Sequence, residues 1–165
     1  MLQPRHFYVT YGQTSLLLAG AAYRGWISGD AQAFYEEGIR ANIDIYSFYP
    51  IASPIPTEEV NAYLANPEVA YNAANALELI NTQYWLVNFS NGTEAFANVR
   101  RSGFHDLERN DFNNNLLANG EDGFVHRMTY PDREGLANSD SYTATASAIG
   151  RDNLVSRVFW DNLCL

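Results

Sequence analysis

The sequence predicts an all-α protein of tetratricopeptide-like helical hairpins followed by an irregular C-terminal arm. Apolar residues recur at helical spacing over the first hundred residues, and short turns rich in Gly or Asn separate these segments. After Phe104 the pattern dissolves, and Asn, Asp and Gly dominate residues 105–123. We therefore assign residues 1–104 to the hairpins and residues 105–165 to the irregular arm, within a single domain.

The first hairpin is expected between Thr10 and residue 46. Thr10 is the predicted N-cap of its first helix, and Gln13 stands where a side chain can reach back to the cap, which makes a capping box. Gly25 to Gly29 ends this helix, and Asp30 caps a second one over residues 31–46. Small residues at the contact allow a close approach of the two helices. The expected contact faces are Leu17, Ala21 and Ala22, with Leu18 beside them, and Phe34, Gly38, Ala41 and Ile45.

A second hairpin is expected further along the chain. After a short helix over residues 58–65, capped by Thr57, the strongest helical pattern covers residues 73–89, and a last helix covers residues 93–102. Gly103 is the expected left-handed cap. Because adjacent residues on a helix point in different directions, we expect one of Arg100 and Arg101 to bind carboxylates of the arm and the other to face water.

Composition narrows the classes of partner. The chain has 165 residues, 47% of them hydrophobic and 14% aromatic, which is typical of a globular protein. The net charge is -9, and all ten basic residues are Arg. A nucleic acid requires a basic stripe, and an anionic membrane would repel this chain. Neutral ligands such as sugars suit the charge best.

No pattern supports a metal, a cofactor or an enzyme. Asp111, Asn113, Asn115 and Asp122 have the spacing of a calcium loop, but Leu116 occupies the place of its required Gly. His6, His105 and His126 are scattered, and Cys164 is a single thiol without a neighbouring base. The sequons at Asn88 and Asn91 fall where a turn would place Asn in any case.

Phe48 and Tyr49 are the candidate ligand-binding residues. They lie in a loop with three prolines between residues 47 and 56, and loop aromatics on a helical scaffold can stack on a ligand. The alternative is that both rings are tucked under the loop.

The start of the chain shows no signal peptide, and the longest apolar run, residues 16–22, is too short to span a bilayer. Alone, this pattern indicates a soluble cytoplasmic protein, although a fragment without its true N-terminus would look the same.

Three stretches of the chain together carry a family pattern. They are Thr10-Tyr11, 16–22, Gly25-Trp26, Gly29-Asp30-Ala31, Tyr35 and Gly38-Ile39; then 76–78, Thr82-Gln83, Trp85, Phe89, Asn91-Gly92, Glu94-Ala95 and 100–104; then Arg127, Tyr130-Pro131, Glu134, Asn138, Tyr142, Gly150, Asp152 and Trp160-Asp161. In order and spacing, along nearly the whole chain, they resemble the SusD/RagB family, in particular its SusD-like nutrient-binding outer-membrane lipoproteins. This sequence departs from the family pattern at Gly20, where Glu is usual, at Tyr84, where Lys is usual, and at His105, where Pro is usual.

The resemblance implies a C-terminal portion of a longer, non-catalytic protein. Family members begin with a lipoprotein signal, carry further hairpins upstream and sit at the cell surface in the outer membrane. There they deliver glycans or peptides to a SusC-type TonB-dependent transporter. The aromatic platform of starch-binding members comes largely from earlier segments. The assignment of Phe48 and Tyr49 as ligand-binding residues therefore rests on this sequence alone and not on the resemblance. The alternative is a scaffold that contacts the transporter without binding the nutrient.

The first helix carries Leu16, Leu17 and Leu18 in succession, and these span most of its circumference. One neighbouring helix covers only part of them. We therefore expect the isolated chain to form a dimer or larger species, or to be poorly soluble.

Overall fold

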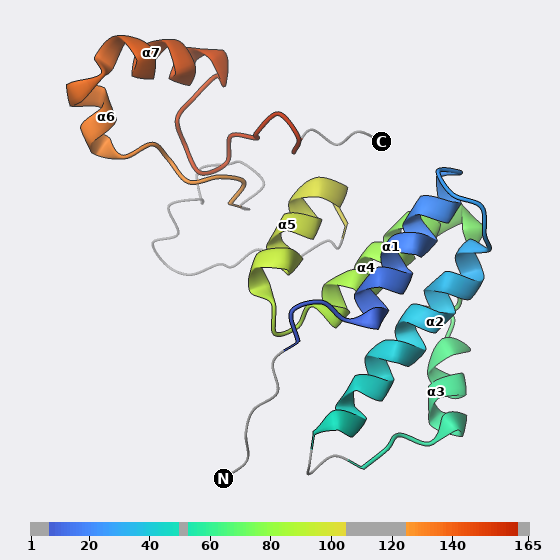
Figure 1. The fold of residues 1–165 in the computed structure, drawn as a ribbon. Helices are drawn as coiled ribbons and strands as arrows, with labels where there is room; N and C mark the ends of the chain where they lie inside the picture. Colours follow the sequence, from blue (N-terminus) through green and yellow to red (C-terminus); the bar gives the residue numbers. More distant parts are fainter. Residues whose placement is uncertain (1–6, 50–52, 105–124, 162–165) are drawn as a thin grey trace. The chain divides into compact units, whose positions relative to one another are not determined.

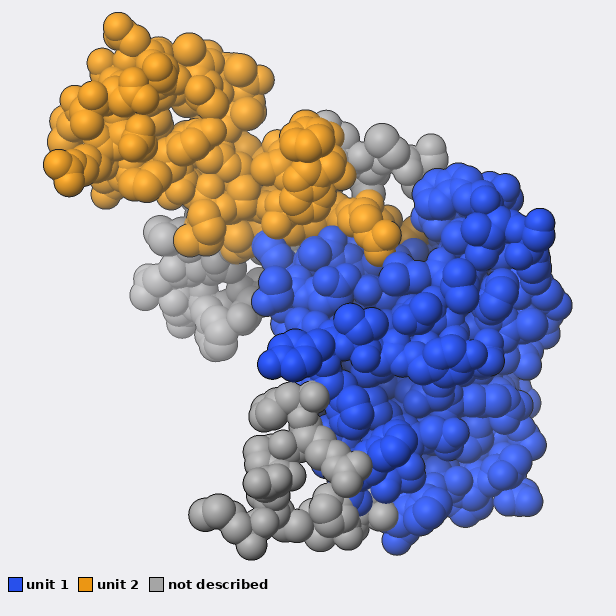
Figure 2. All heavy atoms as spheres, viewed as in Figure 1, with its two compact units in different colours: residues 1–99 blue, residues 100–165 orange. Residues whose placement is uncertain are grey.

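The computed structural model describes residues 7–49, 53–104 and 125–161, and every regular element in these ranges is a helix (Figure 1). The predicted all-α fold class is therefore confirmed. The chain divides into two compact units, residues 1–99 and residues 100–165, and each is described by itself (Figure 2). No helix in the described ranges is both long and apolar enough to cross a membrane.

The first unit is a small helical stack. Figure 1 shows α1 and α2 running antiparallel, with α3 next to α2. Both α1 and α2 also contact α4. Leu16, Tyr35, Ile39 and Ile80 lie in the core between these helices. The elements are α1 (Tyr11–Tyr23), α2 (Ala31–Asp44), the 3-10 turn η1 (Ile45–Phe48), α3 (Thr57–Leu64), the 3-10 turn η2 (Ala73–Asn75), α4 (Ala76–Val87) and α5 (Gly92–Ser102), whose last turn belongs to the second unit.

The helix boundaries follow local signals in the sequence. The capping box of Thr10 and Gln13 is present at the start of α1, and the Asp30 carboxylate accepts hydrogen bonds from two backbone N–H groups at the start of α2. Gly25 and Gly103 both have positive φ, at 71° and 70°. Thr57 differs from its expected role, because it is the first residue of α3 and Pro56 occupies the cap position.

Helices α1 and α2 approach closely where two glycines face each other. A Cβ atom added to Gly38 would lie 2.7 Å from Cγ of Leu16, and one added to Gly12 would lie 3.0 Å from the Gly38 carbonyl oxygen. The predicted close contact through Gly38 is confirmed, but the expected face of α1 is wrong. Leu17 is 46% exposed, whereas Leu16 is 1% exposed, because the glycine contact turns Leu16 toward α2.

Tyr35 ties α2 to the turn that precedes α4. Its side chain is fully buried, and its hydroxyl donates a 2.7 Å hydrogen bond to the Val69 carbonyl oxygen. The ring lies 5.6 Å from that of Tyr71, and burial raises the pKa of Tyr35 well above its usual value. This contact holds residues 66–70 against the core.

The second unit is not irregular throughout, which corrects the expectation for residues 105–165. It contains α6 (Asp132–Ala137) and α7 (Ser139–Ala148). Pro131 precedes two acidic residues in the first turn of α6, which is a favourable helix start. The apolar periodicity that identifies a helix is missing because neither helix buries a residue.

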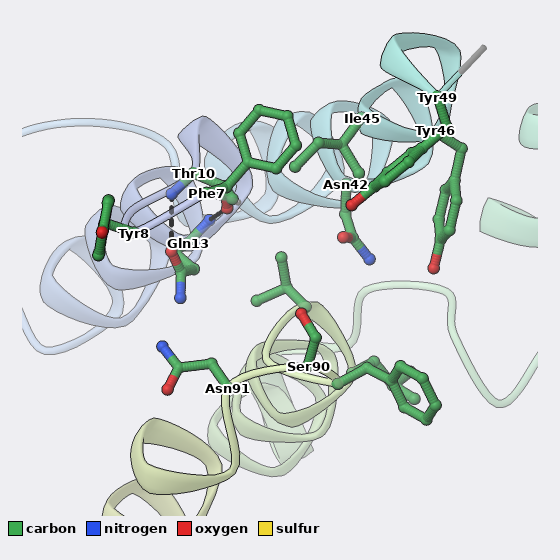
Figure 3. Close-up of a pocket in the computed structure, with 13 residues that line it drawn as sticks. Phe7, Tyr8, Thr10, Gln13, Asn42, Ile45, Tyr46, Tyr49, Ser90 and Asn91 are labelled. Carbon is green, nitrogen blue, oxygen red and sulfur yellow. Dashed lines mark hydrogen bonds between the residues drawn. The ribbon is translucent and has the colours of Figure 1, made fainter. Parts of the chain in front are cut away.

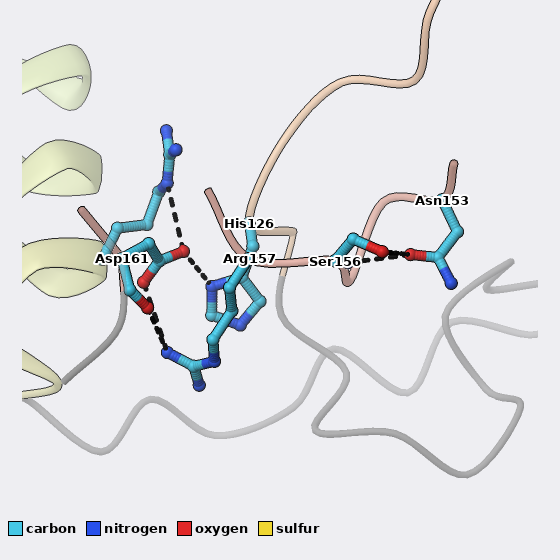
Figure 4. A network of polar contacts seen from close by, with 6 residues as sticks. His126, Asn153, Ser156, Arg157 and Asp161 are labelled. Atoms are coloured by element: carbon cyan, nitrogen blue, oxygen red, sulfur yellow. Dashed lines mark hydrogen bonds and ion pairs between the residues drawn. The ribbon is translucent and has the colours of Figure 1, made fainter. Parts of the chain in front are cut away.

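A buried carboxylate organises the second unit (Figure 4). Asp161 is fully buried and accepts a 2.7 Å hydrogen bond from Nδ1 of His126. Arg157 binds it at 3.2 Å, and Nε of Arg100 lies 3.7 Å away. The guanidinium of Arg100 also stacks on the ring of Trp160, at 4.3 Å from the ring centre. These cations offset the cost of burying a charge.

A second carboxylate, that of Asp152, links residues 127–130 to α7. Asp152 binds Arg127 at 3.1 Å and accepts hydrogen bonds from the backbone N–H of Tyr130, at 3.1 Å, and from the hydroxyl of Tyr142, at 3.3 Å. Residues 127–130 are thereby held to α7 by polar contacts.

Substitution of Gly38 by Ala tests the close contact between α1 and α2. The added Cβ meets Leu16, so we expect a loss of about 1–3 kcal/mol in the free energy of unfolding. Gly92→Ala is the control, because nothing lies within 4 Å of its Cβ position. It should be neutral or slightly stabilising, and equal losses in urea titrations of the two variants would contradict the account.

Arg100 and Arg101 should differ in their effect on stability. Arg100 binds Asp161 and stacks on Trp160, whereas the Arg101 side chain is exposed. Arg100→Ala should cost roughly 1–2 kcal/mol and Arg101→Ala less than about 0.5 kcal/mol. Thermal melts followed by Trp fluorescence measure both, and two equal losses would contradict the expected difference between the two arginines.

Candidate ligand-binding site

A hollow of about 700 Å³ opens in the first unit (Figure 3). Three segments that are distant in sequence surround it: residues 7–13 at the start of α1, residues 42–49 at the end of α2, and residues 86–91 between α4 and α5. Its size falls in the range of about 300–1,000 Å³ typical of small-molecule sites. The lining residues are Phe7, Tyr8, Thr10, Gln13, Asn42, Ile45, Tyr46, Tyr49, Leu86, Val87, Phe89, Ser90 and Asn91.

Aromatic rings form one part of the lining. Tyr46 and Tyr49 lie 6.5 Å apart between ring centres, and Phe7 packs edge-on against Tyr49 at 6.4 Å. The turn η1 brings them together, because it tightens the end of α2 before Tyr49 returns to an extended backbone. Tyr46 is 49% exposed and Tyr49 is 37% exposed, so their faces remain accessible to a ligand.

Side-chain amides form the other part. The carbonyl oxygen of the Gln13 side chain accepts a 2.7 Å hydrogen bond from the Thr10 backbone N–H, and its NH₂ group donates to the Asn88 side chain. Asn88 is 1% exposed and in turn donates to the Tyr84 carbonyl oxygen at 2.8 Å. This buried chain of hydrogen bonds fixes the orientation of Gln13 at the floor of the hollow.

The hollow also contains a polar group that none of the described residues bonds. The side-chain amide of Asn42 is half-buried, and none of the described residues forms a hydrogen bond with it. Figure 3 shows the polar ends of Gln13, Asn42, Ser90 and Asn91 turned toward the same space. The amide both donates and accepts hydrogen bonds, so a bound molecule with hydroxyl or amide groups could pair with it in place of water.

None of the thirteen lining residues is charged at neutral pH. The lining therefore offers aromatic faces together with neutral donors and acceptors, a combination that suits a neutral ligand with flat faces and many hydroxyl or amide groups.

The structure places the two residues expected to bind ligand differently. Tyr49 lines the hollow, whereas Phe48 lies outside its lining, is 51% exposed and packs against Phe7 at 6.0 Å between ring centres. The role of both residues in binding stays a prediction.

Sequence reasoning missed Asn42, Ile45 and Tyr46, although a signal was present. With Tyr49 these residues have the spacing i, i+3, i+4 and i+7 of one helical face, and that face is polar and aromatic rather than apolar. The residues from other segments gave no such signal, because they reach the hollow only through the packing of α1 on α4.

The structure describes only some of the other candidate site residues named from the sequence. His126 is hydrogen-bonded to Asp161, as expected for a scattered His, while the proposed calcium loop, His6, His105 and Cys164 lie outside the described residues. Within the described ranges no group of three metal-ligating side chains is present. Both sequons fall at the expected turn, where Asn91 accepts a hydrogen bond from the backbone of Glu94.

Comparison with known proteins identifies the family to which the chain belongs. Residues 2–131 match the model of a SusD-like family described as starch-binding and associating with the outer membrane. A SusD-like protein of Bacteroidetes AC2a is 35% identical, with a TM-score of 0.80 over 93% of this chain and 30% of its own. A chitin-binding protein is 32% identical, with a TM-score of 0.71 over 92% of this chain and 32% of its own. A SusD homologue from Bacteroides fragilis is 28% identical, with a TM-score of 0.74 over 92% of this chain and 34% of its own.

The regular elements of both described units are helices, which defines a helical module. The chain belongs to the SusD-like family, and it spans about a third of the length of the solved structures that it matches. A comparison with curated proteins found no match.

Replacing Gln13 by Met tests the floor of the hollow. The change keeps the length of the side chain but leaves the Asn88 side chain and the Thr10 N–H without their partner. We expect a loss of about 1–3 kcal/mol in unfolding free energy. Gln32→Met is the control, because Gln32 is exposed and bonds only near the surface. Urea titrations with equal midpoints would contradict this role for Gln13.

Proposed function

We propose that this chain is a part of a non-catalytic protein that binds a glycan or peptide nutrient at the bacterial cell surface. The observation that carries the proposal is the uncharged hollow of aromatic and amide side chains in a chain of a family described as starch-binding. The chitin-binding name of one relative supports the same class of ligand.

The lining of the hollow favours binding over catalysis. A glycosidase requires two carboxylates placed on either side of the scissile bond. The described residues around the hollow provide Asn, Gln, Ser, Thr and Tyr but no carboxylate and no His. Such groups orient a sugar without supplying an acid and a base at neutral pH.

Delivery to a transporter is the finer part of the proposal. In this view the longer protein is a lipoprotein of the outer membrane that passes its nutrient to a SusC-type TonB-dependent transporter. The family's association with the outer membrane supports the location, and the resemblance in sequence supports the partner.

The second candidate function is a scaffold that docks on the transporter without binding the nutrient. It is favoured by exposed apolar side chains outside the hollow. Trp26 is 73% exposed at the turn between α1 and α2, and Tyr23 beside it is 40% exposed. Such groups suit contact with another protein surface.

Replacing Phe48 and Tyr49 together by Ala tests the original assignment of ligand residues. If both rings stack on a sugar, each contributes on the order of 1 kcal/mol, and glycan affinity falls about tenfold or more. Titration calorimetry with soluble oligosaccharides measures this, and the melting temperature should hardly change. The control is Tyr23→Ala, an exposed Tyr outside the hollow. An unchanged affinity in the double variant of the full-length protein would place the glycan site elsewhere in that protein and favour the scaffold function for this portion.

A further inference from the structure

We infer that the hollow between α1, α2 and the α4–α5 turn is a subsite for an uncharged oligosaccharide, with Asn42 and Tyr46 as its contacts to the ligand. The inference rests on the proposed function, since it names the site and the ligand class of the nutrient-binding role. It adds residues that neither the family match nor the sequence pattern assigns.

The aromatic part of the lining fits the apolar face of a sugar ring. A pyranose presents C–H groups on its faces and hydroxyls around its edge, so it packs flat on an aromatic ring while its edge stays polar. Tyr46 and Tyr49 provide such rings from one helix end, with Phe7 closing the side of Tyr49. The three rings are held by one another and need little ordering on binding.

The polar part of the lining fits the hydroxyl edge. A hydroxyl donates one hydrogen bond and accepts others, so it pairs with an amide in either sense. Asn91 uses its side-chain oxygen to cap α5, and Gln13 uses its oxygen on Thr10. The Gln13 nitrogen donates to Asn88 and so holds the floor of the hollow in place, while the side-chain nitrogen of Asn91 can donate toward sugar oxygens (Figure 3).

Asn42 is the most specific element of the site. It projects from α2 into the hollow at half burial, and no described residue bonds its amide. A polar group in that position gains most from a ligand that both donates and accepts, as a sugar hydroxyl does.

An extended peptide fits the same space less well. One common way to bind an extended peptide is to pair its backbone with a sheet edge, and the described residues contain no strand. Charged termini or side chains would require an opposite charge, and none of the lining residues carries one. The chemistry of the lining therefore favours a neutral saccharide.

The test compares variants of the hollow with matched controls by titration calorimetry. The probes are maltoheptaose, chitohexaose and an acetylated, amidated octapeptide of Gly, Ser, Asn and Tyr. The variants are Asn42→Ala, which removes an amide that no described residue bonds, and Tyr46→Ala. The controls are Asn61→Ala, an exposed Asn on α3, and Trp26→Ala, an exposed aromatic outside the hollow.

We expect at least one oligosaccharide to bind. Asn42→Ala and Tyr46→Ala should each weaken binding about fivefold or more, while both controls stay within about twofold. The melting temperature of Asn42→Ala should equal or exceed that of the unmodified protein, because Ala is the better helix former. Lost affinity with retained stability distinguishes a ligand contact from a structural role.

Three results would overturn the inference, and they separate it from the proposed function. Oligosaccharide binding that neither variant weakens would keep nutrient binding and place its site elsewhere. Binding of the peptide, weakened by the same variants, would keep the site and change its ligand class. Binding of no probe would remove nutrient binding from this chain and leave the scaffold function.

Discussion

The close contact between Gly12 and Gly38 fixes the arrangement on which the first unit depends. With no side chain at either position, the backbones of α1 and α2 come near enough for Leu16 to fill the remaining space. This contact determines the rotation of α1, and that rotation points Gln13 toward Asn88 at the end of α4. The hollow is therefore a consequence of helix packing, and buried hydrogen bonds hold its polar floor in place.

The two units are stabilised by different interactions. The first unit has a buried apolar core, whereas the buried side chains described in the second unit are the polar pair His126 and Asp161. Ion pairs at Asp161 and Asp152 replace apolar packing there. Such pairs hold a chain in one geometry but add little net stability, because burying charges is costly. The second unit is accordingly expected to open before the first one does.

The sequence predicted the features that depend on local chemistry. The capping box at Thr10, the cap at Asp30 and the glycine turns all follow from residue type alone, and they are present. Features that depend on tertiary contacts could not be read in the same way. Three consecutive Leu residues leave the buried face of α1 undecided until Gly38 selects it. The hollow needs three distant segments, so only its α2 part, from Asn42 to Tyr49, had a pattern in the sequence.

The central claim is that a neutral glycan binds in the hollow created by the contact of α1 with α2. Its most direct test is chemical-shift mapping by NMR, with the protein titrated with maltoheptaose and with chitohexaose. The account predicts that side-chain amide signals of Asn42, Gln13 and Asn91 shift together, with the aromatic signals of Tyr46 and Tyr49. Shifts centred instead on Trp26, or confined to residues 125–161, would contradict it.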